Sequence, residues 1–387
     1  MDNLKVIIIG AGMGGLATGI ALRQAGYEVE IYDRVSELRP AGAGISLWSN
    51  GVKVLNRLGL GKEIARIGGY MTRMEYRGKT GEVLTSFSLS PLIETVGERP
   101  YPVSRTELQQ MLLEAFGPER VHLGAKCVAV EQDEHSATAI FEDGSRTTGD
   151  LLIGADGTHS LVRQYVLGHP TERQYVGYVN WNGLVPISPD LIPPDSWVTF
   201  VGEYKRVSLM PIGGDRFYFF FDVPLPKGSV SQPEQYREEL SGFFQGWAEP
   251  VQTLIRRLDP HTTNRIAIHD IKPLDKLVRG RVALLGDAGH STAPDLGQGG
   301  CQAMEDTEVL ARYLLTTNLG VVDALKRYEA ERKDRAADIV MKARKRADLT
   351  HGRDPQRTDE WYEELKQEDG TTIIWAITKT ILAGPLK

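Results

Sequence analysis

The sequence predicts an α/β fold in which a parallel sheet lies between layers of helices, a second and mostly antiparallel β-sheet is inserted, and helices end the chain. Three observations predict it. A run at 4–9 that is apolar except for Lys5 leads into a glycine-rich turn, and a second buried run precedes the glycine-rich stretch 286–300. Between them, residues 174–269 show the alternation of half-buried strands. The 387 residues suffice for two interlocked domains.

The N-terminal segment has the pattern of strand, tight turn, helix and strand. Leu4–Ile9 is apolar except for Lys5, as expected for a strand that helices cover on both faces. Gly10, Gly12 and Gly15 form a G-x-G-x-x-G pattern, and Asp33 ends the second strand. Such glycines permit the turn, let a pyrophosphate approach the backbone and let helix and strand pack closely. We therefore predict a Rossmann-type unit with phosphates at the helix N-terminus, rather than a glycine-rich turn without a ligand.

Asp33 narrows the choice of cofactor. A carboxylate at this position accepts hydrogen bonds from a ribose with a free 2′-hydroxyl, as in NAD or FAD, and would repel the 2′-phosphate of NADP. The motif alone does not separate NAD from FAD. The sequence holds no second strand–GxGxxG–helix unit, so we expect one resident dinucleotide.

The middle of the chain has a different sequence pattern from the N-terminal segment. From Gln174 to about Asp270 it reads largely as strands with polar turns, and Gly213–Gly214 signals a hairpin. The run "LVRGRVALLGDAGH" then returns to a buried strand, and a helical pattern extends from Ala324 onward. The predicted division is a discontinuous cofactor-binding domain at 1–72, 100–173 and 270–345, a substrate-binding β-sheet domain at 73–99 and 174–269, and a C-terminal helical segment at 346–387.

Composition excludes several classes of function. The formal net charge of −6 argues against general attraction to nucleic acid. No stretch is long and apolar enough to span a bilayer, which takes about 20 residues. The two cysteines, Cys127 and Cys301, lack C-x-x-C spacing, so neither a disulfide framework nor a cysteine-rich metal site is expected. The run "VIIIG" is too short for a signal-peptide core. We expect a cytoplasmic protein that binds no nucleic acid, membrane or metal.

Two shorter motifs have both a structural and a functional interpretation. Asp156-Gly157 follows a buried strand, and its simplest interpretation is an ordinary Asp-Gly turn. Arg105 is a candidate contact for a phosphate or a cofactor ring. Ser104 and Glu107 have the spacing of a capping box, however, which would make Arg105 an exposed first-turn residue.

With G-x-G-x-x-G, "GADGTHS" and "GDAGHSTAPDLGQGG" in this order, the chain resembles the single-component FAD-dependent aromatic hydroxylases, the group typified by p-hydroxybenzoate hydroxylase. The resemblance spans roughly Leu4 to Arg346 and implies non-covalent FAD in the first site. It also implies that Asp287 contacts the ribityl chain and that the segment after Pro294 brings a helix N-terminus to the pyrimidine end of the flavin. Backbone N–H groups there would stabilise the negative charge of reduced flavin. A flexible lid without flavin contact is the alternative.

We expect the inserted sheet to supply the substrate pocket. Strand alternation puts Asn180 on one face with Tyr178 and Asn182. Whether Tyr218 joins Arg206 depends on the hairpin register, which the sequence leaves open; an even-sum pairing would bring them together. An arginine, an amide and a phenol suit a planar anionic ring. An equally open alternative has Arg206 facing solvent and Asn180 capping a local turn.

Within the family, "GYVNWNGLV", "FVGEYKRVSLMP" and "RFYFFFDVPLP" look like segments of the bacterial urate-hydroxylating members, and the likeness runs to the final "GPLK". It implies that Asn180, Arg206 and Tyr218 bind the substrate, with Arg206 and Tyr218 in catalytic positions. The implied cofactor-binding positions are Gly10, Gly12, Gly14, Gly15, Asp33, Arg34, Ser46, Arg105, Cys127, Asp156, Asp287, Gly297, Gln298, Gly299, Gly300 and Cys301.

The resemblance implies a monooxygenase of purine catabolism that converts urate to 5-hydroxyisourate with NADH and O₂, through a flavin C4a-hydroperoxide. NADH would bind transiently, deliver hydride and leave. Arg206 would hold the urate anion, Asn180 would orient the ring and Tyr218 would lie nearby. The nearest alternative is hydroxylation of another aromatic acid, such as salicylate or a hydroxynicotinate. An FAD-bearing redox sensor without turnover and a nicotinamide-only dehydrogenase are alternatives of other classes.

Overall fold

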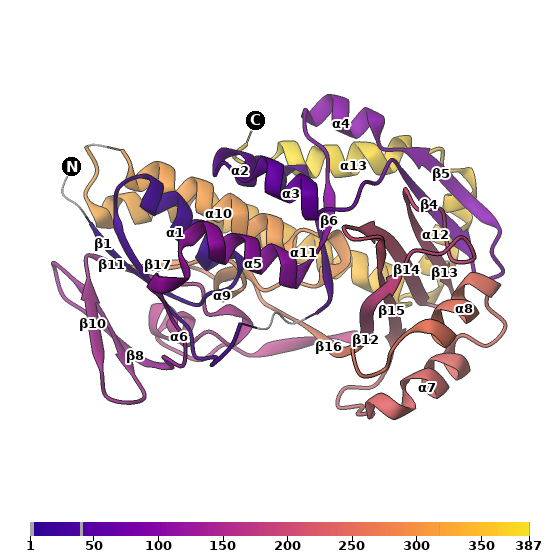
Figure 1. Cartoon of the computed structure of the whole chain (residues 1–387), viewed down its shortest axis with the longest axis horizontal. Coiled ribbons are helices and arrows are strands. Elements are labelled where there is room, and N and C mark those ends of the chain that lie inside the picture. Colours follow the sequence, from indigo (N-terminus) through magenta and orange to yellow (C-terminus); the bar gives the residue numbers. More distant parts are fainter. Residues whose placement is uncertain (1–3, 39–41, 317, 387) are drawn as a thin grey trace.

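A six-stranded sheet forms where the sequence predicts the parallel sheet (Figure 1). In this computed structural model, which describes residues 4–38, 42–316 and 318–386, its order is β17-β18-β11-β1-β2-β7. All neighbours pair in parallel except β17 and β18. The strands are β1 (Lys5–Ile9), β2 (Glu28–Tyr32), β7 (Val121–His122), β11 (Leu151–Gly154), β17 (Val278–Arg279) and β18 (Val282–Leu284).

The two faces of β1 explain its apolar run from Val6 to Ile9. Val6 and Ile8 join the cluster under the main helical layer, whereas Ile7 and Ile9 join a cluster on the opposite face. Both faces are covered from Val6 to Ile9, so none of these four positions is open to a polar side chain, whereas Lys5 at the start of the strand is only half-buried. Opposite the main helices, the cover consists of a short helix and a three-stranded sheet, together with adjoining turns. These elements are α6 (Leu161–Leu167), β8 (Cys127–Gln132), β9 (Ala137–Phe141), β10 (Arg146–Gly149), η2 (Gly157–His159) and α9 (Asp287–His290); η1 (Pro118–Arg120) instead links α5 (Arg105–Phe116) to β7.

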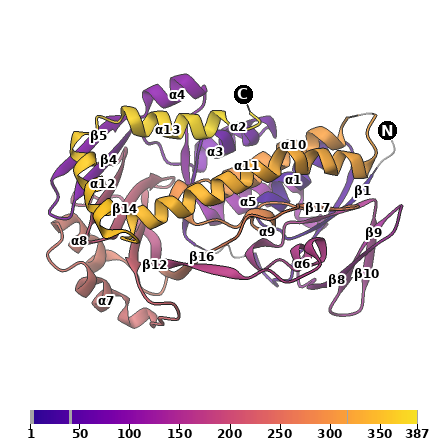
Figure 2. The same cartoon turned by 180° about the vertical axis from the view of Figure 1, so that it is seen from behind.

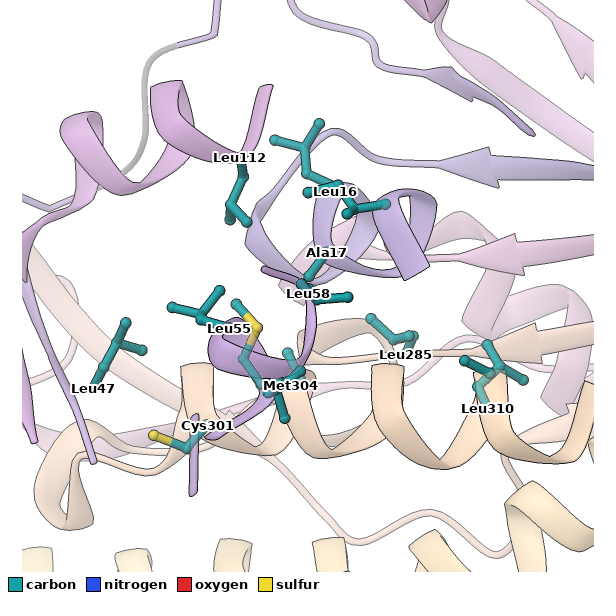
Figure 3. Packing of buried hydrophobic residues seen from close by; sticks show 14 of the residues in the cluster. Leu16, Ala17, Leu47, Leu55, Leu58, Leu112, Leu285, Cys301, Met304 and Leu310 are labelled. Carbon is teal, nitrogen blue, oxygen red and sulfur yellow. The ribbon is translucent and has the colours of Figure 1, made fainter. Parts of the chain in front are cut away.

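The main helical layer packs as one apolar cluster. Figure 3 shows Leu112, Leu55 and Met304 directed into the same core from three different helices. Each buried side chain of this kind stabilises the fold by about 1.5–3 kcal/mol. The elements of this layer are α1 (Met13–Gln24), α2 (Ser49–Arg57), α3 (Gly61–Ile67), α5 (Arg105–Phe116) and α10 (Gly299–Leu314), with the antiparallel pair β3 (Gly44–Leu47) and β6 (Tyr101–Ser104) beside them.

A seven-stranded sheet of order β16-β12-β15-β14-β13-β4-β5 forms the other half of the molecule. Only β13 and β4 pair in parallel, and the predicted hairpin between β14 and β15 turns at Gly213–Gly214. How the chain divides into domains, and at which boundaries, stays a prediction. The strands are β4 (Arg73–Gly78), β5 (Val83–Ser88), β12 (Arg173–Pro186), β13 (Ser196–Gly202), β14 (Lys205–Ile212), β15 (Arg216–Pro224) and β16 (Asn264–Ile271).

One face of this sheet is apolar and is covered by helices that the strand-like interpretation of 174–269 did not include. α7 (Tyr236–Phe243) and α8 (Glu249–Arg257), preceded by η3 (Pro233–Gln235), pack their apolar sides against Trp181 and Phe219. The apolar residues of α7 and α8 recur every three or four positions, which is the helical period rather than the strand period. The opposite face carries the polar residues that the candidate site uses.

The C-terminal helices connect the two halves. Figure 2 shows α11 (Val321–Thr350) running from beside α10 to the seven-stranded sheet. α13 (Thr371–Leu382) packs against α4 (Ser90–Val96), while α12 (Pro355–Gln367) lies beside β5. Across the described part of the chain, none of the helices has the length and apolarity to cross a bilayer.

Candidate active site

Three loops meet at one edge of the parallel sheet. β1, β11 and β18 are neighbours and run parallel, so their carboxyl ends point the same way. The loops that follow them are the Gly10–Gly15 turn, the Asp156-Gly157 turn and the 286–300 loop. The three predicted motifs therefore come together where open α/β sheets bind ligands.

The glycines of the first turn are required for different reasons. At Gly10, where φ is +114°, a Cβ would lie 2.2 Å from the carbonyl oxygen of Ala155; at Gly15 it would lie 2.0 Å from that of Gly10. Gly12 instead faces open space, and α1 begins there without a side-chain cap. Uncapped N–H groups beside open space fit a phosphate.

The other predicted residues of this turn have structural tasks. A Cβ on Gly14 would lie 2.6 Å from Cδ2 of Leu285, so this glycine permits close packing of α1. Asp33 accepts a hydrogen bond from the backbone N–H of Ala11 at 2.7 Å and thereby holds the turn. Its carboxylate has lone pairs left for a ribose hydroxyl. Arg34 is exposed beside it.

Asp156 caps α6. It accepts hydrogen bonds from the backbone N–H of Leu161 at 2.8 Å and from the hydroxyl of Ser160, and burial raises its pKa. Gly157, at φ +74°, completes the Asp-Gly turn. Cys127 begins β8 half-buried, and burial, followed by the charge of Asp156, raises the pKa of its thiol to about 11. Contact of either side chain with a cofactor stays a prediction.

Asp287 is exposed although the residues on both sides of it are buried. The loop is held from behind by buried Asp306, which accepts hydrogen bonds from Gly286 N–H at 2.8 Å and from His290 and Arg332 at 2.6 Å each. Burial alone would raise the pKa of Asp306, but His290 and Arg332 outweigh it and lower the pKa to about 2. The ion cluster fixes the loop and leaves the carboxylate of Asp287 free for a ligand.

The same loop enters α10 through exposed backbone. Gly297 has φ +62°, and a Cβ there would lie 2.7 Å from Nε1 of Trp48 and 2.8 Å from Oγ of Ser46. The indole N–H of Trp48 is buried without a partner in the described structure. α10 begins at Gly299 without a side-chain cap, so its first N–H groups are free. These donors suit an electron-rich ring.

Three predicted residues at this helix start face the protein. Gln298 accepts a hydrogen bond from Asn50 Nδ2 at 3.0 Å. A Cβ on Gly300 would lie 2.6 Å from Cδ1 of Ile45. Cys301 is fully buried, and burial raises the pKa of its thiol to about 12. Their observed contacts position the segment. Contact of these residues with a cofactor stays a prediction.

Arg105 lies between the two halves of the molecule. Ser104 accepts the N–H of Glu107 at 3.5 Å, which is half of the predicted capping box, but Arg105 is half-buried rather than exposed. Its Nε donates to the carbonyl oxygen of Gly44 at 3.1 Å. A Cβ on Gly44 would lie 2.4 Å from Cγ of Tyr218. β3 thus brings Arg105 close to the substrate sheet.

The register of β14 and β15 resolves the open question about Tyr218. Arg206 pairs with Asp222 and Tyr218 pairs with Met210, so the pairing is even-sum and both side chains lie on one face. Tyr218 comes earlier in β15 than Asp222, the residue opposite Arg206, so Tyr218 and Arg206 share the face without being direct partners. Burial raises the pKa of Tyr218 to about 12, and the charge of Arg105 opposes that shift. The phenol therefore stays protonated.

Asn180 and Arg206 belong to one buried hydrogen-bond network. Asn180 donates to Asp222 Oδ1 at 2.6 Å and accepts from Asn182 at 2.7 Å. Arg206 donates to Asp222 Oδ2 at 2.7 Å, and its side chain is only 12% exposed. The alternative with a solvent-facing arginine and a turn-capping asparagine is wrong, because both side chains donate hydrogen bonds to the buried carboxylate of Asp222.

A second carboxylate joins this network to the cofactor loop. Asp295, in η4 (Pro294–Leu296), accepts hydrogen bonds from Arg206 at 3.1 Å and from the hydroxyl of Tyr178 at 2.7 Å. Burial would lower the pKa of Arg206, but Asp222 and Asp295 outweigh burial and raise it. Arg206 is therefore a permanent buried cation, held between the two halves.

Sequence reasoning missed the roles of Asp222, Asp295, Tyr178 and His351. The position of Asp222 on the strand face of Tyr218 was a usable signal. His351 had no such signal, because it comes from the end of α11; its ring packs against that of Tyr178 with centroids 4.0 Å apart. Only the folded chain places these residues together.

The sheet edge fits FAD by three independent features. Open space beside Gly12 meets the uncapped start of α1, an exposed carboxylate at Asp287 follows a fixed loop, and the uncapped start of α10 adjoins an unpartnered indole N–H. They suit a pyrophosphate, a polyol and an electron-rich ring respectively. The polar face of the seven-stranded sheet lies against the third feature through Asp295.

Comparison with known proteins identifies close relatives. The FAD-binding-domain family matches residues 3–343. An FAD-dependent urate hydroxylase of Klebsiella pneumoniae is 55% identical over 99% of this chain and 100% of its own length, and one of Mycolicibacterium vanbaalenii is 52% identical over 99% and 98%. The crystal structure of Klebsiella pneumoniae HpxO complexed with FAD and uric acid is 54% identical, covers 100% of this chain and 98% of its own, and superimposes with a TM-score of 0.97. A salicylate hydroxylase substrate complex, 24% identical with a TM-score of 0.78 over 99% of both chains, shares the fold.

Proposed function

The chain belongs to the FAD-binding-domain family, within the group that contains the FAD-dependent urate hydroxylases, and on that premise we propose that it hydroxylates urate at C5. The product is 5-hydroxyisourate, and NADH and O₂ are the co-substrates. The observation that carries the proposal is the buried pair of Arg206 and Asn180 on a polar sheet face beside the cofactor loop. Full-length likeness to the crystallised complex with FAD and uric acid supports it.

The parallel-sheet edge would hold the cofactor. The N–H groups at Gly12 bind the pyrophosphate, Asp33 the ribose, Asp287 the ribityl chain and the backbone at Gly297 the pyrimidine end of the ring. When bound, FAD supplies the redox chemistry, taking hydride from NADH and activating O₂ for transfer to the substrate. Everything else falls to the chain's own residues.

The substrate residues perform orientation and charge stabilisation. Arg206 holds the anionic substrate, because its guanidinium stays charged and offers a planar set of donors. Asn180 orients the ring, and Asp222 keeps both side chains in place through its two oxygens. Tyr218, protonated and buried, lines the pocket between β3 and the sheet. Such alignment favours reaction by holding the reacting atoms about 3–3.5 Å apart.

A direct assay tests this function. The FAD-loaded protein is mixed with NADH and urate, and urate absorbance is followed together with oxygen uptake. We expect urate to disappear with a matched uptake of oxygen. Salicylate and a hydroxynicotinate serve as parallel substrates; consumption of one of them in place of urate would assign another aromatic acid. NADH oxidation without consumption of any substrate would contradict the proposal.

Given two cysteines without C-x-x-C spacing, we expect the reaction to run in the cytoplasm.

A further inference from the structure

Arg206 is surrounded by more negative charge than it can balance. Asp222 on β15 and Asp295 on η4 both bind its guanidinium, and the side chains of both carboxylates are fully buried. Two carboxylates and one guanidinium leave a net charge of −1. A substrate anion that binds at Arg206 would therefore enter a site that is already negative, at a real electrostatic cost in a buried setting.

His351 is placed to correct this imbalance. It follows α11 directly, its Nδ1 lies 3.2 Å from the carbonyl oxygen of Tyr204, and its Nε2 lies 3.8 Å from Asp295 Oδ1. That Nε2 is buried and has no hydrogen-bond partner within the described chain. Tyr178 of β12 covers the ring. If His351 Nε2 gained a proton, it could donate a hydrogen bond to the carboxylate of Asp295, and the two would form an ion pair.

Burial and the charges around His351 act on its pKa in opposite directions, and the net effect lowers it. Burial lowers the pKa of His351, whereas Asp222 and Asp295 raise it and Arg206 lowers it. The carboxyl end of the 30-residue helix α11 adds partial negative charge beside the ring. The ring is thus neutral while Arg206 compensates the carboxylates, and a further negative charge at Arg206 shifts the balance towards the imidazolium.

We propose that the Asp295–His351 pair takes up one proton when an anionic substrate binds at Arg206. The inference rests on the proposed function. The proton leaves a buffer acid, whose electron pair stays with the buffer base, and forms an N–H bond at His351 Nε2 that points to Asp295. The four side chains Asp222, Asp295, Arg206 and His351 then sum to zero charge, so the substrate anion no longer meets a site that is already negative. His351 acts through Asp295 and Arg206 and does not touch the substrate.

Calorimetry tests the proton uptake. Urate is titrated into the FAD-loaded wild-type protein near neutral pH in two buffers of different ionisation enthalpy, and the difference in observed heat gives the number of protons taken up. We expect about one proton for wild type and close to none for His351→Gln, whose urate Kd rises about tenfold or more because the charge is no longer balanced. His269→Gln, which removes a histidine on β16 that contacts Tyr175, is the matched control and should behave as wild type.

The outcomes distinguish a failure of the proton-uptake inference from a failure of the proposed function. Urate binding to wild type without proton uptake overturns the inference and leaves the proposed function standing. Undiminished proton uptake in His351→Gln also overturns it. Absence of urate binding by the FAD-loaded wild type overturns the proposed function and the inference together. In the Asp295→Asn variant, which has one carboxylate fewer, we expect urate binding with no proton uptake, and uptake of a full proton there would contradict the charge argument.

Discussion

The two parts of the candidate site are built by different means. At the edge of the parallel sheet, the predicted cofactor site is formed mostly by backbone. It consists of glycines without room for a Cβ, uncapped helix starts and one exposed carboxylate. On the seven-stranded sheet, buried side chains from β12, β14, β15 and η4 form the predicted substrate site through a chain of hydrogen bonds. Each loop of the first part is a motif that is local in sequence, whereas the second part depends on single residues from several strands.

This difference has a functional meaning. A backbone cradle suits a cofactor that stays in place, since it needs close approach and little discrimination. A side-chain network suits a substrate that must be chosen and oriented, because each donor and acceptor adds specificity. Mutations in the cradle should therefore weaken FAD binding or the fold, and mutations in the side-chain network should impair substrate turnover without loss of FAD. The following changes test this, from the largest expected effect to the smallest.

Asp306→Asn tests the support behind the cofactor loop. The change leaves buried Arg332 with one carboxylate partner fewer and weakens the hold on Gly286, so we expect the free energy of unfolding to fall by roughly 3–5 kcal/mol in urea titrations of the apoprotein. Glu308→Gln, on the same helix but in an exposed pair with Arg57, is the control and should cost less than about 1 kcal/mol. Equal effects would contradict the role of the buried cluster.

The low pKa of Asp306 also gives stability a pH dependence. Its pKa is about 2 in the fold, below the unfolded value of about 4, so the unfolded state binds the proton more tightly. The contribution is therefore fully present above about pH 4 and is lost as the pH falls towards 2. In the Asp306→Asn variant this part of the acid sensitivity should be missing from urea unfolding curves.

Gly10→Ala and Gly12→Ala separate folding from binding within one turn. A Cβ at Gly10 meets the carbonyl of Ala155 at a left-handed φ, so we expect a loss of roughly 2–4 kcal/mol in unfolding free energy. Gly12 has open space, so its substitution should change apoprotein stability by no more than about 0.5 kcal/mol while weakening FAD binding. Undiminished FAD affinity in Gly12→Ala would argue against a phosphate at this position.

Asn180→Ala tests the side-chain network without touching the cofactor cradle. Removal of the amide leaves Asp222 and Asn182 short of a partner, and we expect kcat/KM for urate to fall by roughly 10–100-fold with an unchanged FAD Kd. Asn264→Ala, which removes only a 3.5 Å contact to Asn182, should alter kcat/KM by less than about threefold. A parallel loss of FAD would show that the two parts are not separable.

Asp287→Ala should have the smallest overall effect and, like Gly12→Ala, should leave the fold almost unchanged. The side chain is exposed, so apoprotein stability should change by no more than about 0.5 kcal/mol. FAD loses one hydrogen-bond partner, and its Kd should rise about tenfold. Fluorescence titration and flavin content after gel filtration measure this; wild-type retention would contradict the ribityl contact.

How much could be predicted from the sequence follows the same division. The turn around Gly10 could be predicted because a tight turn at positive φ demands glycine at the position itself. The same reasoning located the loop at Gly297. The buried parallel sheet could be predicted from apolar runs such as Val6–Ile9, which are typical of a strand covered on both faces.

The substrate side could be predicted only in part. Strand alternation placed Asn180 and Arg206 on sheet faces, but alternation does not reveal which strands are neighbours, so the carboxylates of Asp222 and Asp295 went unassigned. His351 comes from a helix end more than a hundred residues away from Arg206. The short helices α7 and α8 were read as part of a strand-rich region because their apolar faces are brief.

The central claim is that the cofactor cradle and the substrate network are separate devices joined at Arg206. The most direct test is urate consumption by FAD-loaded Arg206→Gln, measured beside its flavin content. We predict wild-type flavin content with urate turnover reduced by about 100-fold or more, since a neutral amide cannot hold the anion. Wild-type urate turnover in this variant, or turnover that falls only in proportion to lost flavin, would contradict the account.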